Sequence, residues 1–136
     1  MSAIKLAIHL LLDDAGITGL VGTDVYPVAA PQEKGLPYIA VSLVWEEQET
    51  ILAGHLDAYT SRVSFACVAA SLSAADAIAE AIKDAMSGVV NTNVLDGQGQ
   101  RMATVTAWKE GTDMTDYTED RTVFRRLLDY RMRWVR

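Results

Sequence analysis

The sequence has 136 residues, half of them apolar, and a formal net charge of −6. This length predicts one domain, residues 1–136, with its own core. The single cysteine, Cys67, excludes a disulfide within the chain and a cysteine-based zinc cluster. The longest nearly apolar run, residues 4–12, is far shorter than the roughly 20 residues of a membrane span. We therefore expect a soluble protein, made in the cytoplasm, with no membrane partner.

The N-terminal quarter predicts a helix followed by a short extended segment. Ser2 is a plausible N-cap, and Gly16 is placed to end the helix. Between them, apolar residues recur at helical spacing: Ile4, Ala7, Ile8, Leu11 and Leu12. Residues 18–21 are compatible with one more helical turn, and residues 25–26 predict a short strand that ends at a proline.

Two stretches with a period of two follow, which is typical of strands. In residues 38–45 one face holds Ile39, Val41, Leu43 and Trp45. In residues 60–69 the core side holds Val63, Phe65 and Cys67. The acidic stretch between them, residues 46–59, is expected to be a loop, so the two strands should be antiparallel neighbours.

The second half predicts a helix and two more strands. Ser73 and Asp76 resemble a capping box at the start of an alanine-rich helix that Gly88 closes. Residues 89–99 are expected to be a loop. Strands are expected at about 101–109 and 122–135, separated by an acidic loop. In the last strand the apolar face contains Phe124, Leu128, Tyr130, Met132 and Trp134, and Arg126 breaks the pattern.

These elements predict an α+β fold. We expect a mostly antiparallel sheet of four to five strands, with two amphipathic helices packed on one face.

Charge is distributed unevenly along the chain. Residues 121–136 hold six of the 12 basic residues, whereas residues 46–57 and 109–120 are rich in acids. Such separation can steer partners together, or the opposite charges can screen each other within one monomer. The candidate interface residues in these segments are Glu46, Glu47, Glu49, Asp57, Asp113, Asp116, Glu119, Asp120, Arg125, Arg131 and Arg133.

No catalytic, cofactor or metal site is expected. His55 lies near Glu49 and Asp57, which allows a small enzyme or a metal site, but this spacing is a weak signal. Cys67 alternates with core residues, which indicates a buried hydrophobe rather than a nucleophile. The arginine face of the last strand allows nucleic-acid binding, yet Tyr130 and Trp134 should point to the opposite, core side.

The order of the short motifs resembles a known family. Residues 19–27 read Gly-Leu-Val-Gly-Thr-Asp-Val-Tyr-Pro, and residues 36–39 read Leu-Pro-Tyr-Ile. An alternating strand, an alanine-rich helix and an arginine-rich last strand after an acidic turn complete the pattern. This order is similar to that of the tail-completion (tail-terminator) proteins of phages, prophages and gene transfer agents.

The resemblance implies a homohexameric ring at the tail–head junction of a virion. Such a ring caps the tail tube, ends its polymerisation and joins the tail to the head connector. The implied partners are other copies of the chain, the major tail tube protein and the head-closure or stopper protein, with DNA only passing through the lumen. Another neck protein, such as a head-closure protein, is the nearest alternative.

Overall fold

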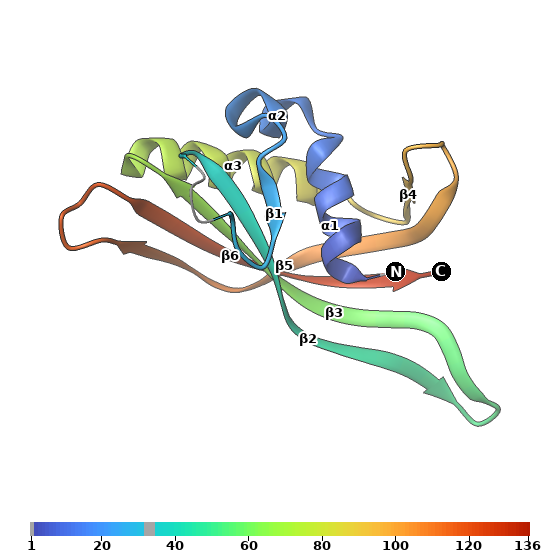
Figure 1. Ribbon diagram of the computed structural model, residues 1–136. Helices are drawn as coiled ribbons and strands as arrows, with labels where there is room; N and C mark the ends of the chain where they lie inside the picture. Colours follow the sequence, from blue (N-terminus) through green and yellow to red (C-terminus); the bar gives the residue numbers. More distant parts are fainter. Residues whose placement is uncertain (1, 32–34) are drawn as a thin grey trace.

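Three helices lie on one face of a six-stranded sheet in the computed structural model, which describes residues 2–31 and 35–136 (Figure 1). The helices are α1 (Ala3–Leu12), α2 (Ala15–Val21) and α3 (Leu72–Ser87). The strands are β1 (Val25–Pro27), β2 (Tyr38–Ile51), β3 (Gly54–Ala69), β4 (Thr92–Leu95), β5 (Arg101–Tyr117) and β6 (Phe124–Val135). They are arranged in the order β1-β2-β3-β6-β5-β4.

The sheet is mostly antiparallel, and β1 with β2 is its parallel pair. Two long hairpins, β2–β3 and β5–β6, meet where β3 pairs with β6. The expected α+β class is correct, and the expected four to five strands and two helices become six and three. The added strand, β4, falls in a stretch expected to be a loop. It has four residues, of which Val94 is buried, so its alternation is too short to be recognised.

The N-terminal helical region is divided differently from the prediction. The Ser2 hydroxyl accepts a hydrogen bond from the Lys5 amide at 3.2 Å, which confirms Ser2 as the N-cap of α1. Gly16 does not end this helix. α1 ends at Leu12, and the Asp14 carboxylate caps a separate helix, α2, by accepting from the Ile17 amide at 3.2 Å.

The N-cap of the third helix lies two residues before the expected one. Ser71, rather than Ser73, accepts a hydrogen bond from the Ala74 amide at 3.1 Å. The buried face of α3 carries small and medium side chains, which bring the helix close to the sheet: Ala75, Ile78, Ala79, Ile82 and Met86.

The core lies between the helices and one face of the sheet. Most of the strand residues expected to face it are buried, whereas Leu43 is 42% exposed and Phe124 is partly buried. The buried ones include Val63, Phe65, Cys67, Leu128, Tyr130, Met132 and Trp134. Trp134 stacks on Tyr59 with 4.3 Å between ring centroids, and Tyr130 meets Phe65 edge-on at 5.8 Å. Each such pair adds about 0.5–1.5 kcal/mol beyond the burial of its area.

The two acidic stretches expected to be loops are strands, and this is a correction. β2 continues to Ile51 and β3 begins at Gly54, so only a two-residue turn remains of the expected loop 46–59. Likewise β5 continues to Tyr117 through most of the expected loop 109–120. Acidic residues have low intrinsic strand propensity. Here arginines of β6 compensate for it across the sheet.

A bulge in β2 corrects a second expectation. The pairing shifts between Leu43 and Trp45, so that Trp45 lies opposite Arg62 instead of sharing a face with Leu43. An extra residue in one strand turns the following side chains to the other side. Trp45 therefore lies on the sheet face that the helices do not cover, and 36% of its surface is exposed.

Ser61 is a buried polar residue that links the two hairpins. Its hydroxyl accepts a hydrogen bond from Trp134 Nε1 at 2.9 Å and donates one to Glu46 at 2.8 Å. We expect Ser61→Ala to lower the free energy of unfolding by about 1–3 kcal/mol, because the indole N–H loses its acceptor. Urea denaturation followed by tryptophan fluorescence measures this. Ser64→Ala, on the open face of the same strand, is the control and should change the free energy by less than about 0.5 kcal/mol; equal effects would contradict the assignment.

Candidate functional site

The sheet face without helices, which we call the open face, carries a row of tryptophan and arginine across four strands. The pairing register places Trp45, Arg62, Arg131 and Trp108 side by side on β2, β3, β6 and β5. The Arg131 guanidinium lies 5.6 Å from the centre of the Trp45 ring. Trp108 is 42% exposed. Tryptophan and arginine are the residue types that contribute most to protein–protein contacts.

The arginines of β6 are already paired within the chain. Arg131 binds Glu110 at 2.6 Å, and Arg133 holds Glu49 through two bonds of 2.7 and 3.0 Å. Arg125 binds Asp116. The open face therefore has arginines and acids that neutralise one another, as the self-screening alternative predicts. Exposed pairs of this kind add little stability, typically below about 1 kcal/mol.

These pairs keep their carboxylates ionised. The hydrogen bond from Arg133 lowers the pKa of Glu49, and the hydrogen bond from Arg125 lowers the pKa of Asp116. Neither carboxylate is poised to take a proton near neutral pH. General acid–base chemistry requires such a group, with a pKa close to the working pH.

The remaining predicted acids do not form one patch. Glu46 accepts the Ser61 hydrogen bond toward the helices, whereas Asp57 binds Arg136 at 2.9 Å. Asp120 closes the β5–β6 turn by accepting from the hydroxyls of Thr118 and Thr122 at 2.6 and 2.8 Å. Among the described residues, Glu47 and Glu119 have no ion-pair partner.

Asp113 is the centre of a charge cluster that ties α3 to the sheet. It binds Lys83 of α3 at 2.6 Å and Lys109 at 2.7 Å, and Arg126 approaches it at 3.5 Å. Arg126 also reaches Asp76 at 3.4 Å, which explains an arginine on the apolar face of β6. Partial burial opposes ionisation of Asp113, but the hydrogen bonds from Lys109 and Lys83 outweigh it and lower its pKa. Of the three cations around Asp113, Lys109 is only four residues away along the chain, whereas Lys83 and Arg126 are distant, so local sequence alone does not predict the cluster.

A bulge in β5 puts Asp113 in position. The pairing with β6 is interrupted between Glu110 and Met114. Gly111 within the bulge has a φ of +69°, and a Cβ there would lie 2.9 Å from the Arg62 guanidinium. Glycine therefore permits both the left-handed backbone and the close passage of Arg62 on its way to Asp129, which it binds at 2.8 Å.

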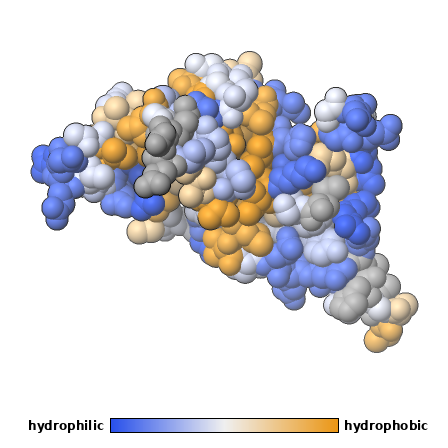
Figure 2. Space-filling view, in the orientation of Figure 1, coloured by the Kyte–Doolittle hydropathy of each residue, from blue (hydrophilic) through white to orange (hydrophobic). Residues whose placement is uncertain are grey.

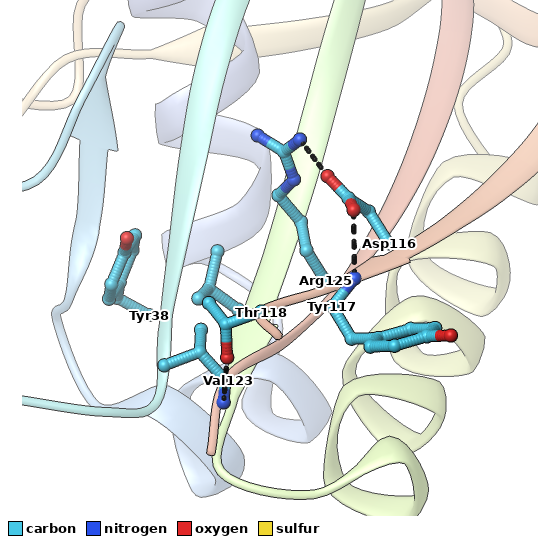
Figure 3. A pocket seen from close by; sticks show the side chains of 7 residues that line it. Tyr38, Asp116, Tyr117, Thr118, Val123 and Arg125 are labelled. Atoms are coloured by element: carbon cyan, nitrogen blue, oxygen red, sulfur yellow. Dashed lines mark hydrogen bonds and ion pairs between the residues drawn. The ribbon is translucent and has the colours of Figure 1, made fainter. Parts of the chain in front are cut away.

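At the far end of the open face, β5 and β6 border a small hollow of about 240 Å³ (Figure 3). Its lining includes Tyr38, Asp116 and Arg125, and the last two point toward each other to form their ion pair. Thr118 accepts a hydrogen bond from the Val123 amide at 3.2 Å beside the hollow. These groups stabilise the hairpin end, and no nucleophile with an adjacent base is among the residues that line the hollow.

The alternative of a small enzyme or metal site formed by His55 with Glu49 and Asp57 gains no support from the described side chains. Glu49 and Asp57 are both bound to arginines, and the side chain of His55 lies outside the described residues. Burial raises the pKa of the Cys67 thiol to about 12, so Cys67 stays protonated. Among the side chains that the structure describes, which do not include that of His55, no three His, Cys, Asp or Glu gather to hold a metal. No helix of the described chain is long and apolar enough to cross a membrane.

The Asp113 cluster predicts an acid-dependent stability. A carboxyl whose pKa is lowered in the folded state stabilises the fold above its unfolded pKa, and this contribution is lost as the pH falls through the folded pKa. We expect Asp113→Asn to lower the free energy of unfolding by about 1 kcal/mol at neutral pH. The difference from the parent should shrink as the pH falls below the ordinary value of 3.8.

Chemical denaturation at a series of pH values checks this expectation. Glu119→Gln is the matched control, because Glu119 makes no ion pair in the described part of the chain. If the free energy of unfolding of Asp113→Asn stays below that of the parent by the same amount at every pH, the effect comes from packing and not from charge.

Comparisons with known proteins identify the family. A family model described as tail completion protein gp17 matches residues 7–134. The fold is similar to that of a chain in the virion of a native gene transfer agent particle, with a TM-score of 0.66 and 23% identity over 99% of this chain and 96% of that chain. No curated protein matches the sequence. Because the family model covers nearly the whole chain, the protein belongs to the tail completion protein gp17 family and is a structural protein of a tailed particle.

Proposed function

We propose that the protein is the tail terminator of its particle. It forms a homohexameric ring at the tail–head junction, caps the tail tube and ends its polymerisation. It contacts the major tail tube protein on one side and the head-closure or stopper protein on the other, and DNA passes through its lumen. The observation that carries this proposal is the match of the tail-completion family model to residues 7–134. The protein acts by assembly and has no catalytic step.

The charge arrangement of the open face supports a role in which DNA passes by without binding. Arginines alone would attract phosphates and hold them. Here the arginines of β6 are neutralised by Glu49, Glu110 and Asp116 of the same chain. A lumen lined by this face offers DNA no continuous basic surface.

Removal of the gene tests the role directly. A particle without its terminator has nothing to stop tube growth, so we expect tails of variable and excessive length, separate from filled heads. Electron microscopy of the purified lysate gives the length distribution. A head-closure protein would behave differently: its loss should leave tails of normal length and heads that leak DNA. That second result would transfer the proposal to the head side of the junction.

That the candidate interface residues contact other subunits remains a proposal. The ion pairs within the chain determine which variants can test it. Reversing Arg133 alone would place two acids together and disturb the monomer. In the exchange variant Glu49→Arg with Arg133→Glu, the pair within the chain is kept and only the charge seen by a neighbouring subunit is reversed. We expect this variant to unfold like the parent but to join fewer tails to heads.

Two measurements decide the exchange experiment. Urea denaturation should show a change in the free energy of unfolding below about 0.5 kcal/mol. Electron microscopy should show the loss of joined particles. Normal joining by a stable exchange variant would mean that Glu49 and Arg133 serve the monomer only.

A further inference from the structure

The tip of the β2–β3 hairpin presents an apolar side chain to solvent. Leu52 leads the two-residue turn and is fully exposed, with a relative accessibility of 111%. The hairpin extends away from the helices (Figure 1), and a hydrophobic spot lies at its end (Figure 2). Residues 52–54, Leu-Ala-Gly, carry no charge. An exposed leucine of this kind does not stabilise the monomer, because its apolar surface stays in water.

An apolar groove lies at the other end of the molecule, where β5 and β6 join. It has a volume of about 380 Å³ and is lined by Leu72, Thr115, Tyr117, Arg121 and Phe124. The Tyr117 and Phe124 rings form its aromatic wall, with 6.1 Å between their centroids. Leu72 is 44% exposed and Tyr117 is 57% exposed, so the groove is accessible to a side chain of another molecule.

Charge permits the tip to enter this groove. The acids nearest the tip, Glu49 and Asp57, are neutralised by Arg133 and Arg136 of their own chain. Glu47 on the hairpin makes no ion pair in the described chain, and neither does Arg121 in the groove, where the guanidinium lies 5.8 Å from the centre of the Tyr117 ring. The hairpin thus brings an uncharged turn, with an unpaired acid farther along β2, to a groove whose lining includes an unpaired cation.

We propose that the β2–β3 tip of one copy inserts Leu52 into the groove between Leu72, Tyr117 and Phe124 of a second copy. The tip and the groove lie at opposite ends of the molecule, so a chain cannot fill its own groove (Figure 1). A contact between two different patches is heterologous, and repeated contacts of this kind form a closed ring where the rotation between neighbouring copies closes. The inference rests on the proposed ring and names the contact that joins its subunits.

The size of the contact predicts when it forms. One leucine in a groove is far smaller than the roughly 1,200–2,000 Å² that a stable interface buries. Two copies alone therefore bind weakly, whereas a closed ring makes every contact at once and gains from their combined effect. Assembly is accordingly expected at high concentration or on the end of a tail tube, and little of it in dilute solution.

Paired cysteines test the contact. Ala53→Cys at the tip and Thr115→Cys in the groove are combined in one chain and oxidised mildly, both in concentrated purified protein and in purified particles. Because Cys67 is buried, it should not form a disulfide under these conditions. We expect a ladder of covalent oligomers on a non-reducing gel. Each single variant should give dimers at most, since a chain with one accessible thiol cannot link to two neighbours.

A matched pair of apolar-to-acid variants tests the role of Leu52. Leu52→Asp in the double-cysteine chain should lower the yield of the ladder at least about tenfold, as expected for losing one buried leucine. Val90→Asp is the control, because Val90 is 63% exposed and belongs neither to the tip nor to the groove. An equal loss in both variants would contradict the insertion of Leu52.

The outcomes separate this inference from the proposed function. If deletion of the gene gives overlong tails but the particles show no ladder, the terminator role stands and the tip contact is wrong. If the tip cysteine links only to a different polypeptide, the tip binds another protein and not a second copy of this chain. If the ladder forms while deletion leaves tail length unchanged, the contact stands and the terminator role is wrong.

Discussion

The pairing of β3 with β6 is the contact on which the rest of the structure depends. It runs from Ala58 opposite Val135 to Ala69 opposite Phe124 and joins the two hairpins into one sheet. On one side it aligns the aromatic core, and on the other it aligns the arginines with their acids. A slip of one residue would exchange these two faces. The buried bond from Trp134 to Ser61 joins the same two strands, so the register is fixed by an interaction that tolerates no shift.

The charge separation along the sequence becomes charge pairing across the sheet. Arginines of β6 reach Glu49 on β2 and Glu110 and Asp116 on β5, so that one strand neutralises acids on both sides of it. The free energy in each exposed pair is small. Their larger effect is on the surface that the open face presents to other molecules. The charged side chains of that face are hydrogen-bonded and locally neutral, and Trp45 and Trp108 remain partly exposed. A surface of this kind favours protein contacts over phosphate contacts.

The sequence predicts those parts of the fold that are determined locally. The caps and stripes of the helices, and the alternation around Phe65 and Trp134, appear in the chain because core burial imposes a period on it. The strand extensions through residues 46–51 and 110–117 could not be predicted in this way. Three of their acids, Glu49, Glu110 and Asp116, are bound by arginines of β6, which come later in the chain. The Asp113 cluster could not be predicted from local sequence either, because its cations come from three elements, α3, β5 and β6. A period of two places Trp45 on the wrong face, because the sequence pattern does not reveal the bulge between Leu43 and Trp45.

The sheet edges explain why self-contact should occur at the hairpin ends instead of along the strands. β1 and β4 are short and cover only parts of β2 and β5, so stretches of both long strands have no strand partner on their outer side among the described residues. Open edges invite unlimited strand pairing, and proteins protect them with bulges and charges. Here β2 has register shifts at Leu43/Trp45 and Gln48/Thr50 and carries Glu47, while β5 is broken between Glu110 and Met114. In the proposed role as a terminator, the protein must not start a polymer of its own. Interrupted sheet edges meet that requirement, and so does the proposed contact between the β2–β3 tip and the groove, because that contact is weak until a ring closes.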